Sequence, residues 1–91
     1  MDNIKRLKIE NDLGLHGRAA AKIVELNNRY QSTLYLKKDG HDEVDGANIL
    51  SILTLDCPKG SEIEARAVGE DSAELLEKLD GLFKRKFGES K

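Results

Sequence analysis

Apolar and polar residues alternate in three segments of the chain, as they do along β-strands that bury one face. After the second segment, Lys38-Asp39-Gly40 is typical of a tight hairpin turn, which predicts a short return strand over residues 41–44. The three segments, with the side chains that we expect to face the core, are residues 4–10 with Leu7 and Ile9, residues 30–37 with Leu34 and Leu36, and residues 62–68 with Ile63, Ala65 and Ala67.

Helical spacing replaces alternation after the first predicted strand. We expect a helix from Gly17 to Arg29, with one polar residue, Asn27, on its apolar face. One face of this helix consists of residues spaced at i, i+3, i+4 and i+7, namely Ala20, Ile23, Val24 and Asn27.

Two further helices are predicted in the second half of the chain. Residues 48–54 are too apolar for an exposed loop, and Asn48 can cap them as a short helix by accepting a hydrogen bond from a first-turn N–H. A longer closing helix begins at Asp71, which has the spacing of a capping box with Glu74, and ends at Gly88. Its apolar face consists of Leu75, Leu76, Leu79, Leu82, Phe83 and Phe87.

The predicted order of elements is β-α-β-β-α-β-α. Strands with a single apolar face need a layer of helices to cover it, so the sequence predicts a two-layer α/β sandwich. A length of 91 residues allows one small hydrophobic core and is too short for two. We therefore expect a single domain over residues 1–91, without repeats or a linker.

Composition narrows the class of protein. Charged residues make up 35% and apolar residues 38%, which is typical of a soluble globular domain, and a net charge of −2 argues against a nucleic-acid partner. The amino terminus has no apolar run typical of a signal peptide, and no stretch reaches the ~20 apolar residues that span a membrane. The lone Cys57 offers no disulfide, and His16 and His41 have no third ligand for a metal. We expect a reduced, cytoplasmic protein without a metal or cofactor.

The candidate chemistry lies between the first strand and the first helix. Gly14 permits a sharp turn, because glycine adopts positive φ at little cost, and His16 follows where the helix begins. Unpaired N–H groups and the positive end of the helix dipole favour an anion there, phosphate above all. Arg18 adds a guanidinium that can bind two phosphate oxygens at once. Because an imidazole nitrogen is itself a nucleophile, the segment predicts phosphoryl transfer.

These residues also carry a resemblance to a known family. Gly14-Leu15-His16-x-Arg18-x-Ala20 resembles the active-site signature of HPr, the histidine-containing phosphocarrier of the bacterial phosphoenolpyruvate-dependent phosphotransferase system. The likeness extends from about Ile4 to Gly88. Its further motifs are Asn48-Ile49-Leu50-Ser51-Ile52-Leu53 with Leu55, then Lys59-Gly60-Ser61-Glu62-Ile63, and then Ala67-x-Gly69-Glu70-Asp71.

The resemblance implies a fold, a reaction and partners. The fold would be an open-faced sandwich whose four-stranded antiparallel sheet has its last strand between the first two and three helices on one face. His16 would accept a phosphoryl group on Nδ1, the pros nitrogen, from Enzyme I and pass it to a IIA domain. The protein would thus be a carrier rather than an independent enzyme, without a cofactor, a nucleic-acid partner or insertion into a membrane, and a monomer.

Neighbouring residues have expected roles too: the chemistry above gives the groups that hold phosphate, and the resemblance gives a docking surface. The phosphoryl group would be held by the backbone N–H of Gly17 or Arg18 and by the guanidinium of Arg18. The short apolar helix would supply the docking surface for partners, as an exposed apolar patch near a charged site does in transient interfaces. The predicted surface consists of Ile49, Leu50 and Leu53 beside Gly17, Ala21 and Lys22.

The chain departs from the family pattern at two positions. Ala19 stands where the family commonly has proline, and alanine fits a first helical turn as well. Asn48 stands where many HPr proteins have a regulatory serine, and an asparagine cannot be phosphorylated. The turn Leu55-Asp56-x-x-Lys59-Gly60 resembles the nitrogen-related branch of the family more than its sugar-uptake members.

Two other functions stay open at this point. The first is a regulatory module that keeps the fold and binds proteins without transferring phosphate, although such a module has no need of His16. The second is a small nucleic-acid-binding domain, against which the acidic net charge argues. The sequence leaves open which IIA domain or sugar is served, and whether the relay drives transport or nitrogen and carbon regulation. It also leaves open whether the protein forms a weak dimer.

Overall fold

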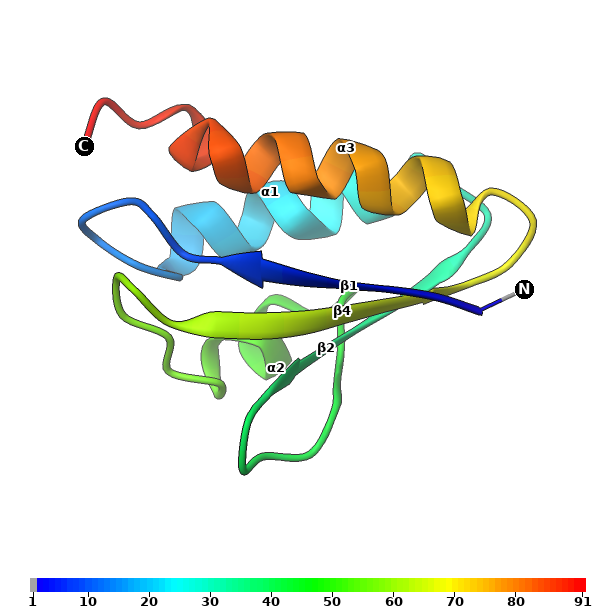
Figure 1. Cartoon of the computed structure of the whole chain (residues 1–91), viewed down its shortest axis with the longest axis horizontal. Helices are drawn as coiled ribbons and strands as arrows, with labels where there is room; N and C mark the ends of the chain where they lie inside the picture. The colour runs from blue at the N-terminus through cyan, green and yellow to red at the C-terminus, as the bar shows by residue number, and fades with distance from the viewer. Residues whose placement is uncertain (1) are drawn as a thin grey trace.

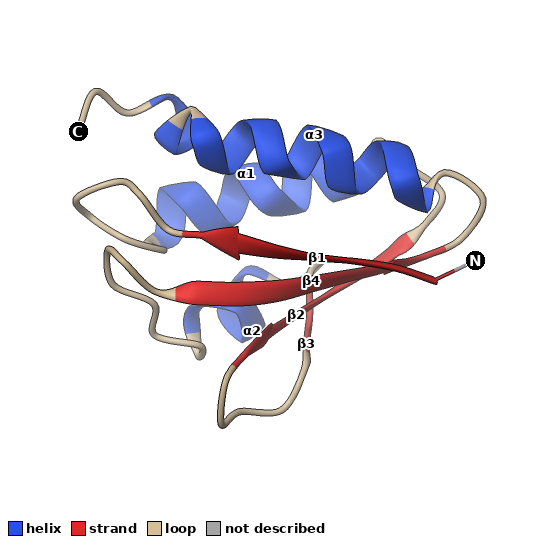
Figure 2. Cartoon of the chain, in the orientation of Figure 1, coloured by secondary structure: helices blue, strands red, loops and turns tan. Residues whose placement is uncertain are grey.

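A computed structural model describes residues 2–91. Its helices and strands follow the order predicted from the sequence, with one short 3₁₀ turn added after the last helix (Figure 2). The elements are β1 (Asp2–Lys8), α1 (Gly17–Asn27), β2 (Thr33–Lys38), β3 (Val44–Asp45), α2 (Ile49–Leu53), β4 (Glu62–Val68), α3 (Ser72–Lys84) and η1 (Lys86–Gly88).

The four strands form one antiparallel sheet in the order β1-β4-β2-β3, which confirms that the last strand lies between the first two. The register pairs Leu7 with Ile63 and Leu36 with Ala65, so the apolar positions of three strands share one face. Side chains alternate across a strand, which is why one register places the whole apolar set on the same side.

Helices cover this apolar face and leave the other open. In Figure 1, α1 and α3 lie side by side over the sheet and run in opposite directions. The short helix α2 contacts α1 and β3. The buried core consists of Leu7, Ile9, Leu15, Ala19, Ala20, Ile23, Leu34, Leu36, Ile52, Leu55, Cys57, Ile63, Ala65, Ala67, Leu75, Leu76, Leu79, Phe83 and Phe87.

The open face of the sheet is held by charge rather than by burial. The Arg66 guanidinium lies 4.5 Å from the centre of the Tyr35 ring, on the neighbouring strand, and donates to both carboxylate oxygens of Glu43 at 2.8 and 2.9 Å. These bonds raise the pKa of Arg66 and lower that of Glu43. The architecture is thus the open-faced, two-layer sandwich expected from the sequence.

Several element boundaries were predicted wrongly. β1 is Asp2–Lys8 rather than residues 4–10, although both predicted inward residues, Leu7 and Ile9, are buried. α1 ends at Asn27 rather than Arg29, because the N–H of Arg29 bonds Leu26 and that of Tyr30 bonds Asn27 in a tightening last turn. β2 begins at Thr33 rather than Tyr30. The return strand is Val44–Asp45 rather than residues 41–44, since Asp45 pairs with Tyr35 and Val44 with Leu36.

The predicted capping box at the start of α3 is also wrong. Asp71 occupies the N-cap position, but its carboxylate makes no cap hydrogen bond. It accepts instead from the backbone N–H of Gln31 at 2.8 Å, from the N–H of Ser32 at 2.9 Å, and from the Ser32 hydroxyl. These bonds hold the pKa of Asp71 below its usual value. The carboxylate therefore ties the α1–β2 connection to α3, at the expense of a cap.

The closing helix was predicted to run to Gly88, but α3 ends at Lys84. The chain then reverses through Lys86 and Phe87, whose φ values of 56° and 57° lie in the left-handed region. The reversal turns Phe87 into the core, where its ring centre lies 4.8 Å from that of Phe83. It also sends the last three residues toward the beginning of α1.

Candidate functional site

His16 is the N-cap of α1, at the helix start where the sequence pattern places it. Its backbone is extended, with φ −91° and ψ 178°, and its carbonyl accepts the first helical hydrogen bond, from the Ala20 N–H at 2.9 Å. Its ring Nδ1 accepts from the backbone N–H of Arg18 at 3.3 Å. The imidazole thus lies at the positive end of α1, where helix N–H groups lack partners within the helix.

The loop before His16 is held against the turn that follows α2. A Cβ added at Gly14, where φ is 69°, would lie 2.5 Å from the Cys57 carbonyl oxygen. The next N–H, that of Leu15, donates to the same carbonyl at 2.8 Å. A side chain at residue 14 would break this approach, so glycine is needed there to position His16.

The second ring nitrogen of His16 is held by the end of the chain. Nε2 forms a hydrogen bond with Oε2 of Glu89, and the other oxygen of this carboxylate accepts from the Asn11 side-chain amide at 3.0 Å. Asn11 is fully buried and also donates to the Gly14 carbonyl at 2.8 Å. The backbone of Asp12 donates to the Lys91 carbonyl at 3.1 Å, which pins the tail beside the loop.

Glu89 is kept ionised by these partners. Partial burial acts to raise its pKa, but the Asn11 amide, the His16 ring and the charge of Arg18 outweigh that effect and leave the pKa below its usual value. An ionised carboxylate only accepts hydrogen bonds, so the shared proton is assigned to Nε2 of His16. A neutral ring protonated on Nε2 has its lone pair on Nδ1. The lone pair therefore faces the N-terminus of α1.

Sequence reasoning missed Glu89. The residue lies in a polar tail after the predicted helix stop, and nothing in its local pattern distinguishes it from other surface carboxylates. Only the reversal at Lys86 and Phe87 brings it to His16.

The structure places a free cation beside the ring. Arg18 is exposed, and within residues 2–91 its guanidinium makes no hydrogen bond or ion pair. It borders a hollow of about 310 Å³ that is also lined by Leu13 and Glu89. A Cβ added at Gly17 would meet nothing within 4 Å, so the space in front of the first turn is open. Both residues predicted to hold a phosphoryl group thus have room to do so.

The predicted docking residues lie close together, since α2 packs beside α1. Leu50 is 76% exposed and Ile49 is 37% exposed, whereas Leu53 is half-buried. Exposed Leu13 adds an apolar side chain, at 65% exposure, that the sequence did not single out. On the α1 side, Gly17 is exposed and Ala21 and Lys22 are half-buried.

Asn48 caps α2, as predicted. Its Oδ1 accepts from the Ser51 N–H at 3.1 Å.

The remaining candidate residues are His41 and Cys57. His41 is exposed beside the hairpin turn, and Cys57 is buried, which raises the pKa of its thiol. Among residues 2–91, no helix is long and apolar enough to cross a membrane.

A histidine at a helix N-terminus, on an open-faced β-α-β-β-α-β-α sandwich, defines the class of histidine phosphocarriers, and comparison with known proteins agrees. The family model described as the PTS HPr component phosphorylation site matches residues 4–85. The chain belongs to this HPr family of the phosphotransferase system, whose members are carriers rather than catalysts.

Relatives and solved structures match along nearly the whole chain. The chain is 35% identical to the phosphocarrier protein NPr of Proteus mirabilis over 98% of its length and 99% of that protein. It is 36% identical to the phosphocarrier protein HPr of Xylella fastidiosa over 91% and 92% of the two chains. Its fold is similar to that of an HPr from Thermoanaerobacter tengcongensis, with a TM-score of 0.91, 30% identity, and coverage of 98% and 99%.

Proposed function

We propose that His16 accepts a phosphoryl group on Nδ1 from phosphorylated Enzyme I and passes it to a IIA domain. The observation that carries the proposal is the pair of contacts on the ring: Nε2 is bonded to Glu89, and Nδ1 faces the N-terminus of α1. This arrangement leaves Nδ1 as the nucleophile and needs no base to deprotonate it.

The transfer step exchanges one bond to phosphorus for another. The Nδ1 lone pair forms a bond to phosphorus while the bond between phosphorus and the donor's leaving atom breaks. Nε2 keeps its proton, so the phosphorylated ring carries a positive charge next to the Glu89 carboxylate. That carboxylate stabilises the charge as it develops, and its pairing with Nε2 is retained for the onward transfer.

The phosphoryl oxygens would then replace the ring as the partner of the helix. Once Nδ1 is bonded to phosphorus it no longer accepts from the N–H of Arg18, which becomes available to a phosphoryl oxygen together with the N–H of Gly17. The unpaired guanidinium of Arg18 supplies a charge-assisted bond. Phosphoryl transfer depends chiefly on such positioning and charge stabilisation.

The apolar patch around the ring suits partners that dock in turn. Ile49, Leu50 and Leu53 on α2 lie beside Gly17, Ala21 and Lys22 on α1, and exposed Leu13 continues the patch. Donor and acceptor can each bury these side chains around the same histidine. Asn48 in this surface offers no hydroxyl that a kinase could phosphorylate. Similarity to both NPr and HPr proteins makes a nitrogen-related and a sugar-specific IIA domain the two acceptors to compare.

The test is intact-mass measurement after incubation with phosphoenolpyruvate and an active Enzyme I. We expect an acid-labile gain of one phosphoryl group in the wild type and in His41→Ala, the control, and none in His16→Ala. Subsequent addition of each IIA domain should remove the gain with one of them. No gain with a donor that phosphorylates another HPr would overturn the proposal and leave a protein-binding module that does not transfer phosphate.

A further inference from the structure

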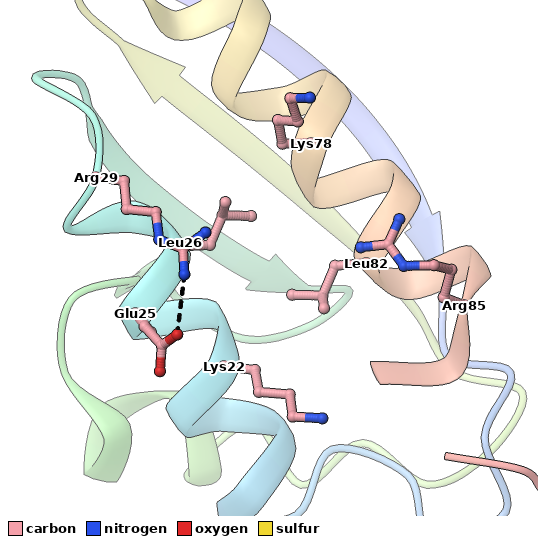
Figure 3. Close-up of a pocket in the computed structure, with 7 residues that line it drawn as sticks. All are labelled: Lys22, Glu25, Leu26, Arg29, Lys78, Leu82 and Arg85. Atoms are coloured by element: carbon pink, nitrogen blue, oxygen red, sulfur yellow. Dashed lines mark hydrogen bonds and ion pairs between the residues drawn. The ribbon is translucent and has the colours of Figure 1, made fainter. Parts of the chain in front are cut away.

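A groove between α1 and α3 gathers positive charge away from the His16 ring, and it shares only Lys22 with the predicted docking surface. Its volume is about 290 Å³, and its walls carry four cationic side chains, one carboxylate and two leucines (Figure 3). The chain as a whole has a net charge of −2, so this excess of cations is local.

Two of the four cations lie at each end of the groove, one from α1 and one from α3. Lys22 and Arg29 are seven residues apart on the α1 side, and Lys78 and Arg85 are seven residues apart on the α3 side. Because α1 and α3 run in opposite directions, Lys22 faces the end that holds Arg85, and Arg29 faces the end that holds Lys78 (Figures 1 and 3). Seven residues rise about 10 Å along a helix axis, so the backbones at the two ends of the groove are about 10 Å apart.

Only part of this charge is compensated within the protein. Glu25 pairs with Arg29 at 3.1 Å, and Lys22 donates to the Phe87 carbonyl. Across residues 2–91, Lys78 and Arg85 have neither an ion pair nor a hydrogen bond of their side chains. Each end of the groove therefore holds one cation without a partner, and clustered like charges destabilise the folded state until a counter-charge binds.

Two leucines lie between the two ends of the groove, and Glu25, the one carboxylate of its walls, is paired with Arg29. Leu26 on α1 and Leu82 on α3 are half-buried and point into the groove from opposite walls (Figure 3). A site with an apolar floor and a few placed charges is typical of small-molecule pockets, and this volume lies at their lower end.

We propose that this groove binds a small molecule with two anionic groups, such as two phosphates, about 10 Å apart and joined by an uncharged middle. One anionic group would lie between Lys22 and Arg85 and the other between Arg29 and Lys78, while the middle covers Leu26 and Leu82. A molecule with one anionic group satisfies one end only. The proposal does not depend on phosphorylation of His16, because none of the four cations contacts the ring.

The test compares two matched probes at low ionic strength, where exposed charges are least screened. ¹⁵N-labelled protein is titrated with a six-carbon α,ω-alkane bisphosphate and with the corresponding monophosphate. We expect the bisphosphate to bind at least about tenfold more tightly, since its second group binds within the same complex. Amide shifts should appear on both α1 and α3. Equal affinity for the two probes, or no saturable binding of either, would overturn the proposal.

Variants locate the binding. Lys78→Ala and Arg85→Ala each remove the free cation of one end, so each should reduce the affinity for the bisphosphate toward that for the monophosphate. Lys37→Ala, on the open face of the sheet, makes the same change in net charge and should have no effect. Equal losses in all three variants would mean that only net charge matters. Binding of polyglutamate without binding of the bisphosphate would assign the groove to an acidic protein segment instead.

Discussion

The N-termini of α1 and α2 are both capped by a side chain, and the two caps differ in what they leave available. Asn48 caps α2 with an amide oxygen that accepts from Ser51 N–H at 3.1 Å. His16 caps α1 with a ring nitrogen that accepts from Arg18 N–H at 3.3 Å, longer than the typical hydrogen bond of about 2.9 Å. The first cap only stabilises a helix. The second is weaker, and its acceptor atom is also a nucleophile.

The comparison shows how one position in a helix can serve stability or chemistry. A nucleophile that caps its own helix is oriented before the partner arrives, and releasing its cap exposes N–H groups to the group that it receives. The His16 cap also has a support that the Asn48 cap lacks, namely Glu89 on the opposite ring nitrogen.

The largest effect is expected from His16→Asn, which gives α1 the type of cap that α2 has. Asparagine is among the best N-cap residues, so the free energy of unfolding should stay within about 1 kcal/mol of the wild-type value. Phosphorylation should be abolished, because the amide is not a nucleophile for phosphorus. Urea unfolding and intact mass after incubation with Enzyme I measure the two quantities. Retained acid-labile phosphate would place the phosphorylation site elsewhere.

Removing the carboxylate of Glu89, which bonds Nε2 of His16, should slow phosphoryl transfer without unfolding the protein. In Glu89→Gln, a neutral amide replaces the carboxylate that fixes the Nε2 proton and stabilises the charged ring. Loss of a carboxylate partner from a functional histidine typically costs at least about tenfold in activity. We expect a loss of this size in the rate of phosphorylation by Enzyme I, measured by rapid quench.

Two further measurements distinguish a positioning role of Glu89 from a purely structural one. The ring nitrogen chemical shifts of His16 should change in Glu89→Gln, while the thermal midpoint stays near the wild-type value. Glu70→Gln removes an exposed carboxylate at the start of α3 and is the matched control. Unchanged ring shifts in Glu89→Gln would show that Glu89 does not position the proton.

A smaller effect is expected at the cap of α2. Asn48→Ala removes the acceptor for Ser51 N–H and should lower the free energy of unfolding by about 1 kcal/mol, or the thermal midpoint by about 4–8 °C. Asn48→Ser keeps an acceptor and should lie near the wild type in calorimetry. Both variants should still be phosphorylated to full occupancy on His16, and a loss of phosphorylation would contradict a purely structural cap.

The smallest effect on stability is expected from Asp71→Asn at the start of α3, where the N-cap side chain makes no cap hydrogen bond. The pKa of Asp71 is lowered, so its carboxylate stabilises the fold above the ordinary pKa of about 3.9, and this stability is lost as the pH falls through the lowered value. The wild type should therefore exceed Asp71→Asn in stability at neutral pH, and the difference should narrow in acid. Urea unfolding from pH 7 to pH 2 measures it; a constant difference would contradict the role of the charge.

The parts of the molecule that could be predicted from the sequence depend on local spacing. The inward positions of β4 follow from alternation, and the Asn48 cap follows from residue type at a helix start. The place of His16 at the start of α1 follows from the helical spacing that begins after it. The order of the strands came from the resemblance to HPr rather than from periodicity, which carries no information about which strands pair.

The parts that could not be predicted depend on contacts between distant residues. Asp71 has the spacing of a capping box, but hydrogen bonds from Gln31 and Ser32 compete for its carboxylate. Glu89 reaches His16 because Lys86 and Phe87 adopt left-handed φ values, which no local sequence pattern predicts. Both carboxylates contact backbone or side chains at least 39 residues away.

The position of β4 between β1 and β2 has a consequence for folding during synthesis. The ribosome completes β1 and β2 well before residues 62–68, yet the two early strands pair only through β4. Until then they have no shared hydrogen-bonding partner, and the apolar faces of the strands and of α1 lack most of their cover. Long-range pairing of this kind delays folding until the loop between the partners can close. The β2–β3 hairpin can pair before β4 is made, but the nascent chain joins β1 to it, and completes the surface around His16, only in a late step.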